Sequence, residues 1–403
     1  MNFTRRLGSL IPLVFCTVAH AASPELEARV SAWLRTWDSQ GIHRTGTAGD
    51  EAGAAWLARE ATAIAGPVTI ETFPFDRIDT VAAYVEIDGR RIDGEAFFDG
   101  PDTSAEGVRG VATDQPGDGL IEVMALSPSA VYGPEFHQMR RDSKHRAQVI
   151  VTLGGAPGLA LLNAESFRTP FGPPAVQLSS VERDRVFAAL ARKAECRVVI
   201  QTKRTPTQAR NVVLTIPGRD RTRPPLIVMT PRSSWWNSTS ERGGGIACWL
   251  ESLRALKANP PICDVIFTAN TGHELGHTGL DDFTARRPGL ESKATWIHYG
   301  ANIGATGSKL MLMSRHDDLR TLVVDHLAIA GKKPDILAEK TLVPTGETKD
   351  IHKAGGRYVT LVGPPSTCPL FHLPQDRWPH AVDVAAIARV AEGMANAVVA
   401  LTR

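Results

Sequence analysis

The sequence predicts an α/β fold: an α/β/α sandwich with a mixed, mostly parallel sheet, plus a β-rich inserted module. From 209 onward, apolar β-like runs alternate with helical segments, which is typical of a sheet covered by helices on both faces. Before that, 81–205 holds only short β-like runs separated by Gly, Pro and Asp turns. This change of pattern predicts a module inserted into the α/β domain.

The individual elements follow from hydrophobic periodicity and turn signals. Helices are predicted at 25–37, 54–65, 245–256, 319–330 and 381–401. Strands of the main sheet are predicted at 211–216, 226–229, 264–269, 294–299, 310–313 and 358–362. Strands of the module are predicted at 84–87, 120–125, 148–153, 159–162 and 198–201, and Asp88-Gly89 is a hairpin signal after the first of them.

The first residues predict export. Arg5 and Arg6 precede an apolar stretch, and Ala19-His20-Ala21 provides a small-residue cleavage site, the pattern of a secretory signal peptide over 1–21. We therefore expect a periplasmic or secreted protein. Its main domain comprises 24–80 and 206–403, and the insert comprises 81–205, with junctions near 80 and 205.

Composition narrows the class of partner. The 45 basic residues nearly balance the 43 acidic ones, without a long basic run, so neither nucleic acid nor stable membrane insertion is expected. A peptide or small amide substrate fits better, and the oligomeric state stays open. Among Cys196, Cys248, Cys263 and Cys368, only a Cys248–Cys263 disulfide is disfavoured, because a helix should separate the two.

The most informative motif follows the predicted strand at 264–269. His273 and Glu274, in Thr271-Gly272-His273-Glu274-Leu275-Gly276, fall at the carboxyl end of that strand, where such sheets bind ligands. The letters 273–277 also match H-E-x-x-H. That zinc motif requires a helix, which Gly272 and Gly276 disfavour, so we interpret the match as coincidental and His277 as a surface or core histidine.

Four segments together resemble the co-catalytic zinc aminopeptidases, relatives of the glutaminyl cyclases. Segment 271–276 resembles their Gly-Glu-Glu-Leu-Gly signature, with His273 in place of the general base. Residues 44–49 resemble the family's N-terminal entry, 211–218 its return strand after an inserted protease-associated module, and 371–376 its Tyr-His-Thr-Pro-x-Asp segment. The resemblance implies that 81–205 is that module.

The resemblance also implies a degenerate metal site. The family's His-x-Asp becomes Arg232-Ser233-Ser234, and one aspartate becomes Ala301. Glu241, Glu274 and His372 remain, a set able to hold a single zinc ion and leave a position for water. Arg232 either replaces the missing cation, pairing with Glu241 or clamping a substrate carboxylate, or neutralises Glu241 in a dead site.

These residues imply a metallopeptidase-like hydrolase that cleaves a peptide or amide bond with one zinc ion. Trp235 and Trp236 are candidates for an apolar substrate pocket beside Arg232. His273 is the candidate general base, and its alternatives are a fourth zinc ligand or a spectator. Two other functions stay open: an inactive peptidase-fold binding protein without metal, and a glutaminyl-cyclase-like acyltransferase.

Overall fold

The computed structural model describes residues 22–403, so the predicted signal peptide lies outside the described residues. The main domain is built on a mixed sheet that continues into the insert. Its centre is four parallel strands in the order β10 (Val265–Asn270), β9 (Leu226–Pro231), β11 (Thr295–Tyr299) and β14 (Arg357–Val362). β8 (Glu195–Ile216) and β12 (Met311–Met313) flank them antiparallel, and β13 (Ile336–Leu337) forms the edge. The predicted mixed, mostly parallel sheet is confirmed.

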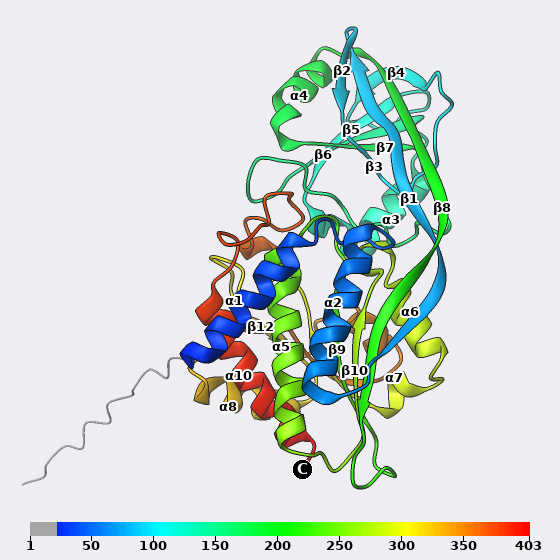
Figure 1. Ribbon diagram of the computed structural model, residues 1–403. Coiled ribbons are helices and arrows are strands. Elements are labelled where there is room, and N and C mark those ends of the chain that lie inside the picture. The colour runs from blue at the N-terminus through cyan, green and yellow to red at the C-terminus, as the bar shows by residue number, and fades with distance from the viewer. Residues whose placement is uncertain (1–21) are drawn as a thin grey trace, which may run out of the picture.

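Helices cover both faces of this sheet because its strands are apolar on both sides. One face carries α1 (Pro24–Ser39), α2 (Ala48–Ala65), α5 (Thr239–Ala258), α8 (Asp317–Ile329) and α10 (Val384–Leu401), packed over Val228 and Phe267. The other face carries α6 (Thr278–Ala285), α7 (Leu290–Lys293) and α9 (Thr348–Lys353), packed over Ile227 and Met229. Figure 1 shows the first group of helices in front of the sheet.

The insert stands on two long strands (Figure 1). β1 (Thr69–Ile87) pairs antiparallel with β8 from Thr69–Val213 to Ile87–Cys196, so both strands run through the main domain and the insert. Asp88 and Gly89 have positive φ and turn β1 into β2 (Arg90–Asp93), which confirms the hairpin signal. The remaining insert strands are β3 (Glu95–Ala96), β4 (Val108–Thr113), β5 (Ile121–Leu126), β6 (Ala147–Thr152) and β7 (Ala175–Leu178), accompanied by α3 (Pro134–Asp142) and α4 (Arg183–Ala191).

The structure differs from the predicted insert in one strand, and it places the predicted junctions inside a strand pair. The strand predicted at 159–162 is wrong, because its backbone bonds to side chains instead of to a neighbouring strand: the Ala160 and Leu162 N–H groups donate to Thr152 and Gln177. The junctions predicted near 80 and 205 fall inside the β1–β8 ladder. The division into domains stays a prediction, but a hydrogen-bonded ladder is a poor site for proteolytic nicking.

Two features bear on export and on membranes. The four cysteines of the described chain are buried and free, so the structure contains none of the disulfides left open above. α10 is long and apolar enough to cross a membrane by composition, but half of its apolar window is buried in the fold. It packs against α5 and α8, as a core helix does.

A buried histidine, His43, holds the segment between α1 and α2 against the loop that follows β9. His43 stacks on Trp37 with ring centroids 3.6 Å apart, and its Nδ1–H donates to the carbonyl of Asn237 at 3.0 Å. Its backbone N–H donates to the Trp236 carbonyl, and the Ser234 N–H donates to its own carbonyl. His43 therefore positions the segment 232–237, which leads into α5.

The titration of His43 should make the protein sensitive to mild acid. Burial lowers the pKa of His43 to about 3, below its unfolded value of about 6.5, so the folded state binds fewer protons. Its stabilising contribution is complete above pH 6.5 and falls as the pH drops toward 3. Between pH 7 and pH 5 we expect the wild-type protein to lose about 2 kcal/mol more than His43→Gln, measured as unfolding free energy in urea. Equal losses in the two proteins would contradict this assignment.

Candidate active site

A small enclosed cavity lies at the carboxyl edge of the parallel strands. His298 near the end of β11 and His273 after β10 line it, together with His277, Tyr132, Lys349 and Phe371. Its volume is about 130 Å³. Tyr132 and Glu165 come from the insert, and Lys349 Nζ lies 3.1 Å from Glu165 Oε2. The insert therefore forms one wall of the cavity, and an ion pair joins that wall to α9.

Glu241 and His372, two of the predicted zinc ligands, lie together behind this cavity. Glu241 Oε1 is 3.4 Å from His372 Nε2, and the Nδ1–H of His372 donates to the Leu161 carbonyl at 2.5 Å. Arg242, which the sequence motifs did not single out, lies next to them. Its NH2 is 2.7 Å from Glu241 Oε1, and both side chains are fully buried. Although burial opposes it, Arg242 and then His372 hold the pKa of Glu241 below its usual range. A guanidinium thus provides the positive charge expected from a metal ion.

Glu274, the third predicted ligand, does not join them. Its Oε1 accepts from the N–H and the hydroxyl of Thr45, both at 2.7 Å, and its Oε2 accepts from Ser233 Oγ at 2.6 Å. Among the described residues, Glu241, Glu274 and His372 do not form a group whose ligand atoms all lie within 4.8 Å. The structure therefore does not assemble the predicted three-ligand site. Neutral donors hold Glu274, and the Arg242 guanidinium lies beside Glu241, although Glu241 Oε1 and His372 Nε2 have no hydrogen-bond partner in the described chain.

Arg232 turns away from Glu241. Its NH1 donates to Asp50 Oδ1 and to the Asp50 carbonyl, both at 2.7 Å, and its NH2 donates to the Arg210 carbonyl. The expected pairing of Arg232 with Glu241 is therefore wrong, and it is the neighbouring Arg242 that makes it. Arg232 is fully buried and does not line the cavity. Its roles in catalysis and substrate binding stay predictions, which the Asp50 pairing disfavours.

Trp235 contacts the insert, and Trp236 contacts the loop that carries His372. The Trp235 indole N–H donates to Asn163 Oδ1 in the insert, and the Trp236 indole N–H donates to the His372 carbonyl, both at 2.9 Å. Both rings line an open groove that also includes Ile42 and Arg44, separate from the histidine-lined cavity. Their predicted role in substrate binding stays untested by these contacts.

Two of the histidines that line the cavity, His273 and His298, contact Glu347, a buried carboxylate for which the sequence offered no motif. The Nδ1–H of His273 donates to its two oxygens, at 2.9 and 3.0 Å. His298 Nε2 lies 3.5 Å from Glu347 Oε2, and neither ring nitrogen of His298 has a hydrogen-bond partner in the described chain. Although burial opposes it, His273 and His277 hold the pKa of Glu347 well below its usual range.

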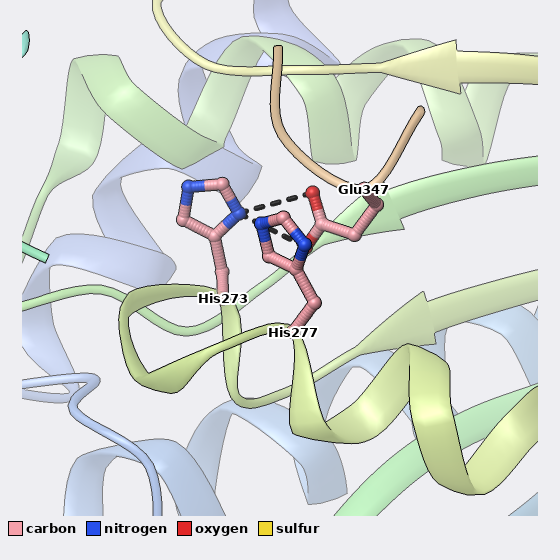
Figure 2. Close-up of side chains that lie close together, drawn as sticks. All are labelled: His273, His277 and Glu347. Carbon is pink, nitrogen blue, oxygen red and sulfur yellow. Dashed lines mark hydrogen bonds and ion pairs between the residues drawn. The ribbon is translucent and has the colours of Figure 1, made fainter. Parts of the chain in front are cut away.

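His277 completes this arrangement from the start of α6 (Figure 2). The chain between His273 and His277 is a short 3-10 turn followed by two residues of positive φ, Gly276 and His277. The predicted absence of an α-helix across the H-E-x-x-H letters is confirmed, and His277 is buried, one of the two alternatives predicted for it. His273, His277 and Glu347 are buried and bring ligand atoms within 4.8 Å of one another. The turn thus brings His273 and His277 together without a helix.

Comparison with solved structures shows where this fold occurs. The chain resembles BSAP, a zinc aminopeptidase from Bacillus subtilis, with a TM-score of 0.74 at 16% identity over 94% of this chain and 95% of that one. It also resembles an aminopeptidase from Aneurinibacillus sp. strain AM-1 (TM-score 0.69, 15% identity, 94% and 93% covered). A peptidase M28 precursor from Shewanella amazonensis SB2B gives a TM-score of 0.72 at 15% identity, with 94% and 96% covered.

No protein-family model and no curated protein sequence matches this chain. The structural likeness nevertheless spans nearly the whole chain, insert included, and it agrees with the resemblance drawn from the motifs. The chain has the fold of the zinc aminopeptidases.

Removing the guanidinium of Arg242 should destabilise the protein strongly. Arg242→Met leaves the Glu241 carboxylate buried without its cation, which costs about 3–5 kcal/mol of unfolding free energy in urea titrations. The double variant Glu241→Gln/Arg242→Met should recover most of this loss, because both charges are then absent. Arg254→Met is the matched control in the same helix, since Arg254 is exposed and its ion pair is worth at most about 1 kcal/mol. Equal effects of Arg242→Met and Arg254→Met would contradict the proposed compensation.

Proposed function

We propose that this chain is an exported, zinc-dependent hydrolase that cleaves a peptide or amide bond of a small substrate inside the histidine-lined cavity. One observation supports it most: three imidazoles line a cavity at the carboxyl ends of parallel strands, in an aminopeptidase fold, and lie close to one buried carboxylate. Imidazole and carboxylate are ligands that zinc uses at catalytic sites. When bound, zinc would polarise the scissile carbonyl and activate water.

The cavity restricts the substrate to a small one. About 130 Å³ is less than the roughly 300–1,000 Å³ of a typical small-molecule pocket. Its walls combine apolar side chains, among them Val343, Val362 and Phe371, with the Lys349–Glu165 ion pair. These walls suit one small or apolar residue next to the scissile bond. Long peptides would have to leave most of their length outside.

His298 is the residue proposed as general base, which accepts a proton from the attacking water. The imidazoles of His273 and His277 each donate Nδ1–H to a carboxylate, Glu347 and Asp350 respectively. His298 lines the same cavity, is 2% exposed, and has both nitrogens unpartnered in the described chain. The geometry therefore favours moving the base role predicted for His273 to His298, since a free lone pair on a buried imidazole is available for proton transfer.

The test is hydrolysis of aminoacyl anilides and dipeptides by the purified mature protein, after metal depletion and after zinc addition. We expect activity only with zinc, and a decrease in kcat of about 10²–10⁴-fold in His298→Gln at unchanged zinc content. His380→Gln is the matched control, because His380 is exposed and does not line the cavity. A folded, zinc-loaded protein that binds these compounds without cleaving them would overturn hydrolysis and favour the binding-protein alternative.

A further inference from the structure

Buried carboxylates at the carboxyl edge of the sheet differ in how their charge is compensated. This difference indicates where a metal ion could bind. Asp50 pairs with Arg232, and Glu241 with Arg242. Glu274 accepts hydrogen bonds from Thr45 and Ser233. Glu347 contacts only histidines through its described ion pairs, and Lys349, two residues further along the chain, is paired with Glu165 instead. Glu241 also contacts a histidine, His372, but among these carboxylates Glu347 is the one whose described ion pairs are with histidines alone.

We propose that the metal centre of this chain has moved from the family position to a new site formed by His273, His277 and Glu347. This deepens the proposed function by naming the ligands, but metal binding at this site does not require turnover. The set of two imidazoles and one carboxylate is one that zinc accepts with an open fourth position. His273 and His277 line the cavity, so a substrate there could reach that position.

The separation of His273 and Glu347 fits a small adjustment to an ion, and the His277 ligand atom lies within 4.8 Å of both. In a tetrahedral site with bonds of about 2.0–2.2 Å, neighbouring ligand atoms lie about 3.3–3.5 Å apart. His273 Nδ1 lies 2.9 and 3.0 Å from the Glu347 oxygens, a separation set by the hydrogen bond that now joins them. Replacing that proton by an ion requires a separation only a few tenths of an ångström larger. All three side chains are buried, so they are already held in place before the ion arrives.

The surroundings of the site match those of a metal centre. A metal-bound histidine usually donates its second ring N–H to a carboxylate, which fixes the tautomer and the ring orientation. His277 does so: its Nδ1–H donates to Asp350 Oδ2 at 2.8 Å, which directs Nε2 toward His273 and Glu347 (Figure 2). His298 provides a second, independent sign. A buried imidazole without a hydrogen-bond partner is costly, and water or an ion beside Glu347 would relieve that cost.

At the family position, Glu241 Oε1 and His372 Nε2 also lack hydrogen-bond partners in the described chain, but a guanidinium already lies beside them. Arg242 lies against Glu241 there, and its Nε donates to the Ser233 carbonyl at 2.7 Å. A divalent cation next to this guanidinium would face an unscreened like charge in a buried setting. The two sites can therefore be separated by mutation.

The experiment is titration of the metal-free mature protein with Zn²⁺ by calorimetry, and with Co²⁺ by visible absorption. We expect one ion per chain. His277→Ala and Glu347→Gln should abolish binding, and Asp350→Asn should weaken it by about 10–100-fold, as expected for a residue that positions a ligand. Glu274→Gln and His372→Gln are matched controls at the family position and should keep the wild-type stoichiometry.

Folding is checked by circular dichroism, and Asp350→Asn keeps the test decisive if His277→Ala fails to fold. Binding lost in Glu274→Gln and His372→Gln but retained in His277→Ala or Asp350→Asn would overturn the new site. So would the absence of any Zn²⁺ or Co²⁺ binding by the wild-type protein, which would leave His273, His277 and Glu347 as a hydrogen-bonded cluster only. Metal binding as expected, without hydrolysis, would instead overturn the proposed function and leave the site standing.

Discussion

The arrangement of this site depends on the need to compensate negative charge that is taken out of water. Burying an unpaired carboxylate costs several kcal/mol, so each one at the strand ends must acquire a partner as the chain folds. Arginine provides that partner for Asp50 and Glu241. For Glu274, three neutral donors share the same task. The oxygens of Asp50 and Glu274 are all hydrogen-bonded within the protein, so these groups have little capacity left to attract an ion, whereas Glu347 is compensated by imidazoles.

The main-sheet strands of the fold were predictable because their physical causes are local. A buried parallel strand needs an apolar run of a few residues and its covering helices need apolar faces, and both leave a periodic pattern in the sequence. The pattern failed at 159–162, an apolar run that is buried but not paired. There Thr152 and Gln177 take the hydrogen bonds that a strand neighbour would have provided. Side-chain partners of that kind are set by tertiary contacts, which periodicity does not record.

The site was predictable only in part, for the same reason. The motif at 271–276 correctly indicated a strand end, because it follows a recognisable apolar strand. Glu347 is 74 residues from His273, in a segment without a metal-ligand motif, and only folding brings it to the cavity. Arg242 directly follows Glu241 in the sequence, yet adjacency did not reveal that it, and not Arg232, makes the pair. A usable signal was the second histidine at 277, whose four-residue spacing from His273 proved meaningful without a helix.

The continuous pairing of β1 with β8 has a consequence for how substrates of different size could be accommodated in proteins of this shape. These strands carry the insert, and with it Glu165 and Tyr132, to a height above the main sheet that is set by their length. Each added residue pair would raise that wall by about 3.4 Å, more than the whole Lys349–Glu165 separation of 3.1 Å. The length of these two strands therefore sets the depth of the cavity, which changes in steps of one residue pair. A single step is enough to separate its two walls.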